Sequence, residues 1–405
     1  MVHVRRGLLL AVTAVLWLAP AATGGAVPLA TRLANALAVR GNSPTLSAAV
    51  ALDLQSGETV FARHGDLPLA PASNEKLTVT FAALRDLGAT YRFRTEVLGR
   101  GVQDGSVWEG DLFLKGFGDP TLSSARLDRL AQAVAATGIT RVDGRVFGDE
   151  SWFDARRTAP GWKAGYLVNE CPPLSALVVD RAWYDHHTAL DPALAAAGAF
   201  RRLLGAHGVT TGAVGVGRAP DAATQLAETD SATLPNVVAV MDRESDNFRA
   251  EMILKTLGAE IGDAGTTAAG AAVVRSDLAS AQVPLQGVVI ADGSGLSLLD
   301  RLTANAVSAL LVSVWNDPVL EKPFWSALPV AGENGTLEDR MESAPARGAV
   351  RAKTGTTDRA SALSGYVRDR YVFAVLQNGW PVSSWSARKA QDRFATALAA
   401  VSAGE

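Results

Sequence analysis

The first residues whose types and spacing could do chemistry are Ser73 and Lys76, in residues 71–79. Apolar residues at helical spacing follow them, so we expect a helix that begins near Ser73 and places Lys76 one turn later on the same face. A positive charge in the first turn opposes the helix dipole, which lowers a lysine pKa from about 10.4. A neutral Lys76 accepts the hydroxyl proton of Ser73 and makes the serine a nucleophile. The alternative interpretation is a serine helix cap followed by a solvated lysine.

Two later motifs also contain serine, threonine or lysine side chains that could take part in catalysis. Residues 245–247 are Ser-Asp-Asn and precede a predicted helix that ends at Gly258. Residues 353–356 are Lys-Thr-Gly-Thr and close a predicted strand. Taken alone, the first motif is typical of a helix cap and the second of a turn.

In chain order, Ser-x-x-Lys, Ser-x-Asn and Lys-Thr-Gly form the signature of the penicillin-recognising serine enzymes, which this chain resembles. Longer phrases resemble the D-alanyl-D-alanine carboxypeptidase/endopeptidase branch, the family of penicillin-binding protein 4. The resemblance implies an α/β (α+β) fold, with a transpeptidase/β-lactamase-like domain of antiparallel sheet and helices and an inserted β-rich domain. The phrases that carry it are residues 116–122, 174–180, 292–297, 328–332, 335–340, 352–356 and 363–366.

The resemblance implies a catalytic role for five residues. Ser73 attacks the carbonyl of the penultimate D-alanine in a peptidoglycan stem peptide, and Lys76 is the base. Ser245 relays the proton to the leaving nitrogen, while Asn247 binds the backbone amide of the substrate. Lys353 meets the terminal carboxylate and, by its charge, disfavours the ammonium form of Lys76.

Five more residues are implied in substrate binding. Thr354 meets the terminal carboxylate, and Gly355 leaves the strand bare so that the substrate lies alongside it. The backbone N–H of Thr356 joins that of the nucleophile in an oxyanion hole worth roughly 3 kcal/mol per donor. Asp246 and Leu296 complete the implied substrate-binding set.

The implied function is a serine D-Ala-D-Ala carboxypeptidase/endopeptidase that works through an acyl-enzyme on Ser73 and is acylated by β-lactams. The resemblance implies no metal and no cofactor. Two residues depart from the family pattern: Leu298 stands where many relatives have an arginine, and Thr357 stands where an apolar residue is usual. These departures affect the pocket for a stem-peptide side chain rather than acylation.

Other functions stay open from the residues alone. One is a catalytically idle peptidoglycan-binding module, which has no need of the intact Ser73 and Lys76. Another is a β-lactamase or esterase on the same scaffold, which requires a second base that the sequence does not identify. A Ser-His-Asp hydrolase is disfavoured because no Gly-x-Ser-x-Gly surrounds a serine. The main substrate, terminal D-alanine or cross-link, also stays open.

The N-terminus has the order of an export signal. Arg5 and Arg6 precede an apolar run over residues 7–18 and small residues at 19–22. We therefore expect a signal peptide over residues 1–26 and a mature protein in the periplasm or extracytoplasmic cell-wall space. A retained anchor is the alternative. No later stretch is long and apolar enough for a transmembrane span.

Composition excludes several other classes of protein. The 405 residues carry a formal net charge of −3 with both signs scattered, so no basic stripe for nucleic acid is present. Cys171 is the single cysteine, which excludes an internal disulfide and argues against a zinc cluster. We expect Cys171 to pack in the interior.

The elements that must position the motifs fall into two regions with different patterns of helices and strands. We predict a discontinuous catalytic domain over residues 27–88 and 231–405, and an inserted β-rich domain over residues 89–230. The alternative is two consecutive domains. The predicted terminal helices are 28–40 and 386–399, the outer strands are 46–53, 58–63, 349–353, 362–368 and 371–377, and the middle strands include 93–98, 107–114 and 142–147.

Overall fold

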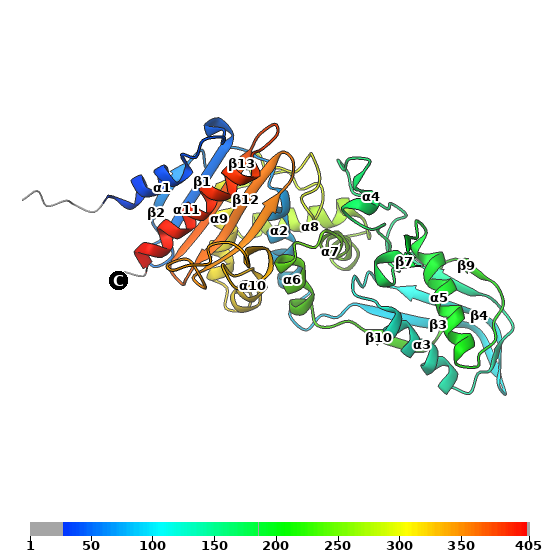
Figure 1. Cartoon of the computed structure of the whole chain (residues 1–405). Coiled ribbons are helices and arrows are strands. Elements are labelled where there is room, and N and C mark those ends of the chain that lie inside the picture. The colour runs from blue at the N-terminus through cyan, green and yellow to red at the C-terminus, as the bar shows by residue number, and fades with distance from the viewer. Residues whose placement is uncertain (1–26, 185, 403–405) are drawn as a thin grey trace, which may run out of the picture.

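A computed structural model describes residues 27–184 and 186–402 of the chain. The predicted signal peptide, residues 1–26, lies outside the described residues. The molecule is elongated, with one sheet at the left of Figure 1 and a second sheet at the lower right. None of the helices in the described ranges has the length and apolar character that a membrane span requires.

The first sheet draws its strands from both ends of the chain. It has five antiparallel strands in the order β11-β12-β13-β1-β2, and the long-range pairing runs from Ser47 opposite Gln377 to Asp53 opposite Tyr371. The α/β (α+β) prediction for the fold class is confirmed. The strands are β1 (Ser47–Asp53), β2 (Thr59–Arg63), β11 (Val350–Thr356), β12 (Ala360–Val367) and β13 (Tyr371–Asn378).

Helices cover both faces of this sheet. Successive side chains of a strand point to opposite faces, so one strand can contribute apolar residues to both cores. On β13, Val372 and Ala374 belong to the core on the multi-helix side, whereas Phe373 and Val375 belong to the core on the other side. Figure 1 shows α1 and α11 in front of the sheet. The covering helices are α1 (Leu29–Leu37), α2 (Lys76–Asp86), α6 (Leu234–Arg243), α7 (Asn247–Glu260), α8 (Thr267–Ser280), α9 (Ala304–Trp315), α10 (Glu321–Ala327) and α11 (Ser384–Ser402).

The second sheet lies between α2 and α6 in the chain. It has six strands, in the order β10-β3-β4-β6-β9 with β5 beside β4, and α3 and α5 share its core. The division of the chain at residues 88 and 230 remains our prediction. The elements are β3 (Arg94–Asp104), β4 (Val107–Gly116), α3 (Ser124–Ala136), β5 (Arg141–Val142), β6 (Val146–Asp149), α5 (Pro192–Ala206), β9 (Val214–Val216) and β10 (Thr224–Asp230).

The prediction of one continuous strand over residues 142–147 is wrong. The structure divides it into β5 and β6, which both pair with β4. Between them the Asp111 carboxylate accepts the Arg145 N–H at 2.9 Å, so a side chain replaces a ladder partner. Alternation alone does not reveal such a replacement, because the flanking residues keep their register.

Shorter elements complete the chain. Cys171 is fully buried among the apolar residues beside α7, as predicted. The remaining helices and strands are α4 (Tyr166–Asn169), β7 (Trp183–Tyr184), β8 (His187–Thr188) and the 3₁₀ turns η1 (Pro44–Leu46), η2 (Ala72–Glu75), η3 (Asp180–Ala182) and η4 (Gly335–Leu337).

The close packing of α7 on α8 predicts the sign of the stability change when a glycine at the contact is replaced. A Cβ built on Gly270 would lie 1.9 Å from the Leu254 carbonyl oxygen. Helix propensity alone predicts that Gly270→Ala stabilises the protein by up to about 1 kcal/mol. We expect the opposite, a loss of about 1–3 kcal/mol in the free energy of unfolding, because the backbones must separate. Urea denaturation measures the change.

Gly205→Ala on α5 is the matched control. Gly205 is exposed, and a Cβ there meets nothing within 4 Å. This substitution should stabilise the protein by about 0.5–1 kcal/mol. A stabilising effect at Gly270 as well would contradict the close contact between α7 and α8.

Candidate active site

The predicted nucleophile lies on a short 3₁₀ turn rather than within the helix itself. Ser73 belongs to η2, and α2 begins at Lys76. The turn packs on the end of β11, where a Cβ on Gly355 would lie 3.0 Å from the Ser73 nitrogen and 2.9 Å from the Pro71 oxygen. Gly355 thus permits the close approach of turn and strand, a role different from the one expected for it.

Lys76 is fully buried, and its amine has three near neighbours. Nζ lies 3.0 Å from the Ser73 Oγ, 2.8 Å from the Asn247 Oδ1 and 2.6 Å from the Ser294 carbonyl oxygen. The Asn247 amide donates to the Glu170 carbonyl at 3.1 Å, which turns its oxygen toward the lysine. A neutral amine has two N–H groups and one lone pair. The two acceptors take the N–H groups, so the lone pair is left for the Ser73 hydroxyl.

The pKa of Lys76 is lowered, and burial is the largest cause. The carboxylates of Asp292 and Glu251 act in the other direction and raise it. The sequence predicts the direction correctly but attributes it to the helix dipole and to Lys353. Removal of the amine from water is the larger effect because a buried charge loses its hydration.

The second lysine of the site holds the second serine. Lys353 is fully buried, and its Nζ donates to the Ser245 Oγ and to the Thr354 carbonyl, both at 2.9 Å. Burial and, to a lesser degree, the charge of Lys76 lower the pKa of Lys353 to about 7. Ser245 has a φ of 57°, a left-handed conformation that costs roughly 1–2 kcal/mol in a residue with a Cβ. Such strain concentrates at functional sites.

Asp246 has its partners inside the protein. It caps α7 by accepting the Arg249 N–H at 3.1 Å, and its carboxylate forms ion pairs with Arg181 at 2.6 Å and with the Arg249 side chain. These pairs lower its pKa against the opposing effect of burial. The structure therefore gives Asp246 a positioning role at the start of α7, beside Ser245 and Asn247.

A cleft of about 450 Å³ opens over Ser73. The Thr354 hydroxyl lies 2.7 Å from that of Thr336, and Arg388 reaches to 3.5 Å from the Thr356 hydroxyl. Five of the lining residues are absent from the set predicted as site residues. Four of them fall in the phrase 335–340, whereas Arg388 had no signal in the sequence. The cleft is lined by Ser73, Ser245, Gly335, Thr336, Asp339, Arg340, Thr354, Gly355, Thr356 and Arg388.

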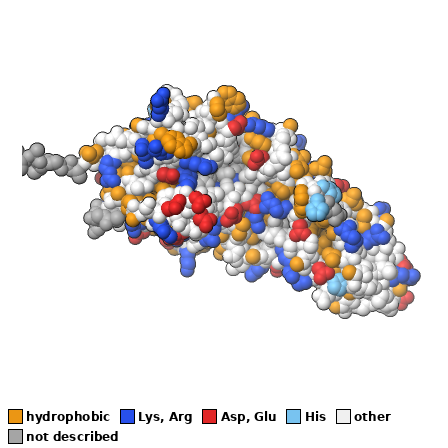
Figure 2. Space-filling model, viewed as in Figure 1, with side chains coloured by type: hydrophobic (Ala, Val, Ile, Leu, Met, Phe, Trp, Pro, Cys, Tyr) orange, Lys and Arg blue, Asp and Glu red, His pale blue; other side chains and the backbone are white. Residues whose placement is uncertain are grey.

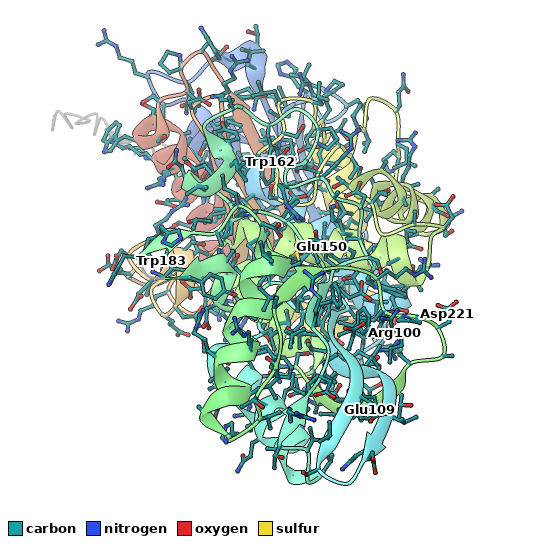
Figure 3. All side chains as sticks on the ribbon, turned by 90° about the vertical axis from the view of Figure 1, so that its right-hand side faces the viewer. Arg100, Glu109, Glu150, Trp162, Trp183 and Asp221 are labelled. Atoms are coloured by element: carbon teal, nitrogen blue, oxygen red, sulfur yellow. The ribbon has the colours of Figure 1, made fainter. Side chains whose placement is uncertain are left out.

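Two buried carboxyl groups, Glu251 on α7 and Asp292 in the loop that follows α8, hold the Ser294 carbonyl against the lysine amine. The Glu251 Oε1 accepts the backbone N–H groups of Gly293 at 3.1 Å and of Ser294 at 2.8 Å. Asp292 Oδ2 accepts the indole N–H of Trp162 at 2.8 Å, and Trp162 is labelled in Figure 3. Burial, followed by the charge of Asp292, raises the pKa of Glu251 to about 8. Sequence reasoning missed Glu251, because a glutamate within a helix is usually exposed.

The last predicted substrate residue, Leu296, lines a different hollow. This second hollow has a volume of about 220 Å³ and adjoins the serine turn through Ala72. Leu298 and Thr357, the two departures from the family pattern, line it as well. The structure thus places Leu296 apart from the cleft that contains Ser73.

Comparisons of sequence agree with this geometry. A profile of the D-Ala-D-Ala carboxypeptidase 3 (S13) family matches residues 29–189 and 185–401. A D-alanyl-D-alanine carboxypeptidase of Actinomadura sp. (strain R39) is 33% identical over 82% of this chain and 78% of its own length. A carboxypeptidase of Mycobacterium tuberculosis is 32% identical over 94% of this chain and 86% of its own length.

Comparisons of structure agree as well. Penicillin binding protein 4 from Haemophilus influenzae is similar, with a TM-score of 0.80 at 20% identity, over 92% of this chain and 98% of that chain. The same protein complexed with a β-lactam gives a TM-score of 0.73 at 21% identity, with the same coverage. These likenesses establish the fold.

The buried carboxyl of Glu251 gives a prediction of pH dependence. Its folded pKa is raised from 4.5 to about 8, so its ionisation costs stability progressively as pH rises through this window. Glu251→Gln keeps an acceptor for the loop N–H groups and cannot ionise. We therefore expect the variant to gain on the wild type between pH 4.5 and 8, by at least the ~1.4 kcal/mol that one pKa unit represents.

Urea denaturation at several pH values measures the difference, and Glu109→Gln is the control. Glu109 is exposed on β4 and lies far from Trp162 in Figure 3. Its substitution should give a small difference that is flat with pH. A flat difference for Glu251→Gln would show that this carboxyl does not change its ionisation on folding.

Proposed function

Because the chain belongs to the D-Ala-D-Ala carboxypeptidase 3 (S13) family, it is a hydrolase of the peptidase class, and we propose that Ser73 is its nucleophile. Its activity is that of a D-Ala-D-Ala carboxypeptidase. The observation that carries the assignment is the buried Lys76 amine, 3.0 Å from the Ser73 Oγ, whose other two contacts are both acceptors. That arrangement suits an amine that receives a proton.

In the proposed acylation step, the Ser73 oxygen attacks the carbonyl of the penultimate D-alanine while its proton passes to Lys76. The backbone N–H groups of Ser73 and Thr356 stabilise the oxyanion. The proton received by Lys76 is then relayed through Ser245, which is bonded to Lys353 at 2.9 Å, to the leaving D-alanine nitrogen. Asn247 positions the base and binds the backbone amide of the substrate. Water then hydrolyses the acyl-enzyme and restores the Ser73 hydroxyl.

The terminal carboxylate of the substrate is proposed to bind at the cationic side of the cleft. We assign its recognition to Lys353 and Thr354, since charge-assisted hydrogen bonds to a carboxylate are strong. Thr336 holds the Thr354 hydroxyl at 2.7 Å, and Arg340 and Arg388 line the same cleft. This excess of donors favours a substrate that ends in a free carboxylate.

β-Lactams resemble the D-Ala-D-Ala terminus, and we propose that they acylate Ser73 and leave slowly. The similar fold of penicillin binding protein 4 complexed with a β-lactam supports this proposal. A β-lactamase on the same scaffold requires a second base close to Ser73 to activate water. The described cleft offers Asp339 as its one carboxylate, with no contact to the nucleophile among those found.

The natural substrate is proposed to be the stem peptide of peptidoglycan, and a cross-link between two stems is a substrate of the same chemistry. This substrate places the enzyme outside the cytoplasmic membrane. The order of basic, apolar and small residues at the N-terminus supports export through a signal peptide. We propose a periplasmic or other extracytoplasmic location on these grounds.

Fluorescent penicillin tests the nucleophile. Ser73→Ala should abolish covalent labelling, because the acyl bond has no other oxygen to form on. Lys76→Met should slow labelling by about 10²–10⁴-fold, the usual effect of losing a general base. Ser106→Ala, at an exposed turn, is the matched control and should label as the wild type does.

The lifetime of the label separates the rival functions. A label that persists for many minutes is expected for a carboxypeptidase, whereas rapid loss with drug turnover indicates a β-lactamase. No labelling of the folded wild type would indicate an idle binding module. Mass spectrometry of digested muropeptides then distinguishes loss of terminal D-alanine from cleavage of a cross-link.

The pKa of Lys353 predicts how substrate preference changes with pH. Lys353 is cationic below its pKa of about 7 and increasingly neutral above it. The ratio of kcat/KM for an acetylated peptide ending in D-Ala-D-Ala to that for its C-terminal amide should therefore fall as pH rises through about 7. Lys76 acts on both substrates alike, so it cancels in the ratio.

Lys353→Arg is the control, because arginine stays charged throughout this range. Its ratio should be flat with pH even where its absolute rate is reduced. A wild-type ratio that does not change between pH 6 and 8.5 would assign carboxylate recognition to another group.

A further inference from the structure

A large hollow lies away from Ser73, along the outer side of α11. We name it the α11 groove; its volume is about 700 Å³. Its helical lining runs from residue 385 to residue 400, a length of roughly 22 Å at about 1.5 Å per residue. The groove is lined by Arg32, Met341, Trp385, Arg388, Lys389, Asp392, Arg393, Thr396, Ala397 and Ala400.

The α11 groove adjoins the cleft that contains Ser73. Arg388 lines both hollows and reaches to 3.5 Å from the Thr356 hydroxyl at the end of β11. Arg340 of the cleft forms an ion pair at 2.6 Å with Asp392 of the groove. The two hollows therefore lie side by side, with Arg388 and the Arg340–Asp392 pair at their boundary.

The charges of the groove favour an anionic ligand. Four cations line it, and Asp392 is the one carboxylate among its lining residues. Arg340 already pairs with Asp392. Within the described ranges, Arg388, Lys389 and Arg393 form no ion pair with a carboxylate, so their charge is available to a ligand.

The groove also presents an aromatic surface. Trp385 is 68% exposed, and the Lys389 ammonium lies 4.5 Å from the centre of its ring. Figure 2 shows blue Lys and Arg side chains beside orange hydrophobic ones over the region of α11. An exposed indole offers a flat apolar face on which a sugar ring can stack, while the adjacent cations meet carboxylates.

We propose that the α11 groove binds the distal, sugar-bearing and carboxylate-bearing part of the same peptidoglycan strand whose peptide end occupies the cleft. The inference rests on the proposed function, since it extends that substrate beyond the scissile bond. Adjacency to the cleft at Arg388 favours this occupant over a membrane surface, because a substrate held in the cleft extends past that residue. The groove thereby selects polymeric or glycan-linked substrate over a short peptide.

Binding in the absence of turnover tests the proposal. The full-length protein carrying Ser73→Ala is titrated with a purified disaccharide-pentapeptide, with and without Lys389→Gln, Arg393→Gln and Trp385→Ala combined. The groove substitutions should weaken binding about tenfold, and affinity before substitution should fall as salt increases. A short acetylated peptide ending in D-Ala-D-Ala should bind both proteins within twofold.

Arg218→Gln is the matched control, an exposed arginine remote from the groove that should leave both affinities unchanged. In the catalytic protein, the groove substitutions should raise KM for the disaccharide-pentapeptide while kcat stays within twofold. Acylation by fluorescent penicillin should be unaffected, which shows that the variant is folded and its cleft intact.

The outcomes separate the two proposals. Equal loss of affinity for short and glycan-linked ligands, or no loss for either, overturns the groove assignment. Groove-dependent binding to vesicles of anionic phospholipid, with unchanged affinity for the disaccharide-pentapeptide, overturns it in favour of a membrane surface. Failure of the wild-type protein to become acylated at Ser73 overturns the proposed nucleophile. The binding measurement does not depend on acylation, so it still decides whether the groove binds the ligand.

Discussion

The structure depends on one constraint: an amine must be kept out of water and still have every hydrogen-bonding position used. Lys76 is fully buried beneath the serine turn, and burial lowers its pKa. Its two acceptors come from α7 and from the loop held by Glu251, while its third neighbour is the Ser73 hydroxyl. Loss of any of these contacts leaves a buried polar group unpaired, which is costly. The site therefore requires the surrounding core to be complete.

That requirement explains how β11 and the start of α7 are arranged around the serine turn. The turn that carries Ser73 fits against β11 because Gly355 has no Cβ, and β11 supplies Lys353 on its way to the cleft. Asp246 anchors the start of α7 by capping and ion pairs, so Ser245 and Asn247 are held toward the two lysines. Each short motif thus combines a reacting side chain with a residue that fixes the backbone.

The sequence predicted the parts of the site that lie in contiguous motifs, and it predicted the sheet of mixed origin from alternating strands at the two ends of the chain. It did not predict Glu251 or Arg388, because their importance arises from burial and from contacts across the fold rather than from their neighbours in sequence. It also missed α10, whose seven residues include Pro323. The cause of the Lys76 pKa shift was misassigned for the same reason, since exposure is a tertiary property.

The pairing of β1 with β13 has a consequence for the order of events in the life of the protein. Ser73 is synthesised early, whereas Lys353 and the strand beside it arrive within the last part of the chain. Chains released prematurely before β11 therefore lack the second lysine and the edge against which the serine turn rests. A truncated product therefore carries no assembled site, so the geometry that brings Ser73 and Lys353 together exists only once synthesis is nearly complete.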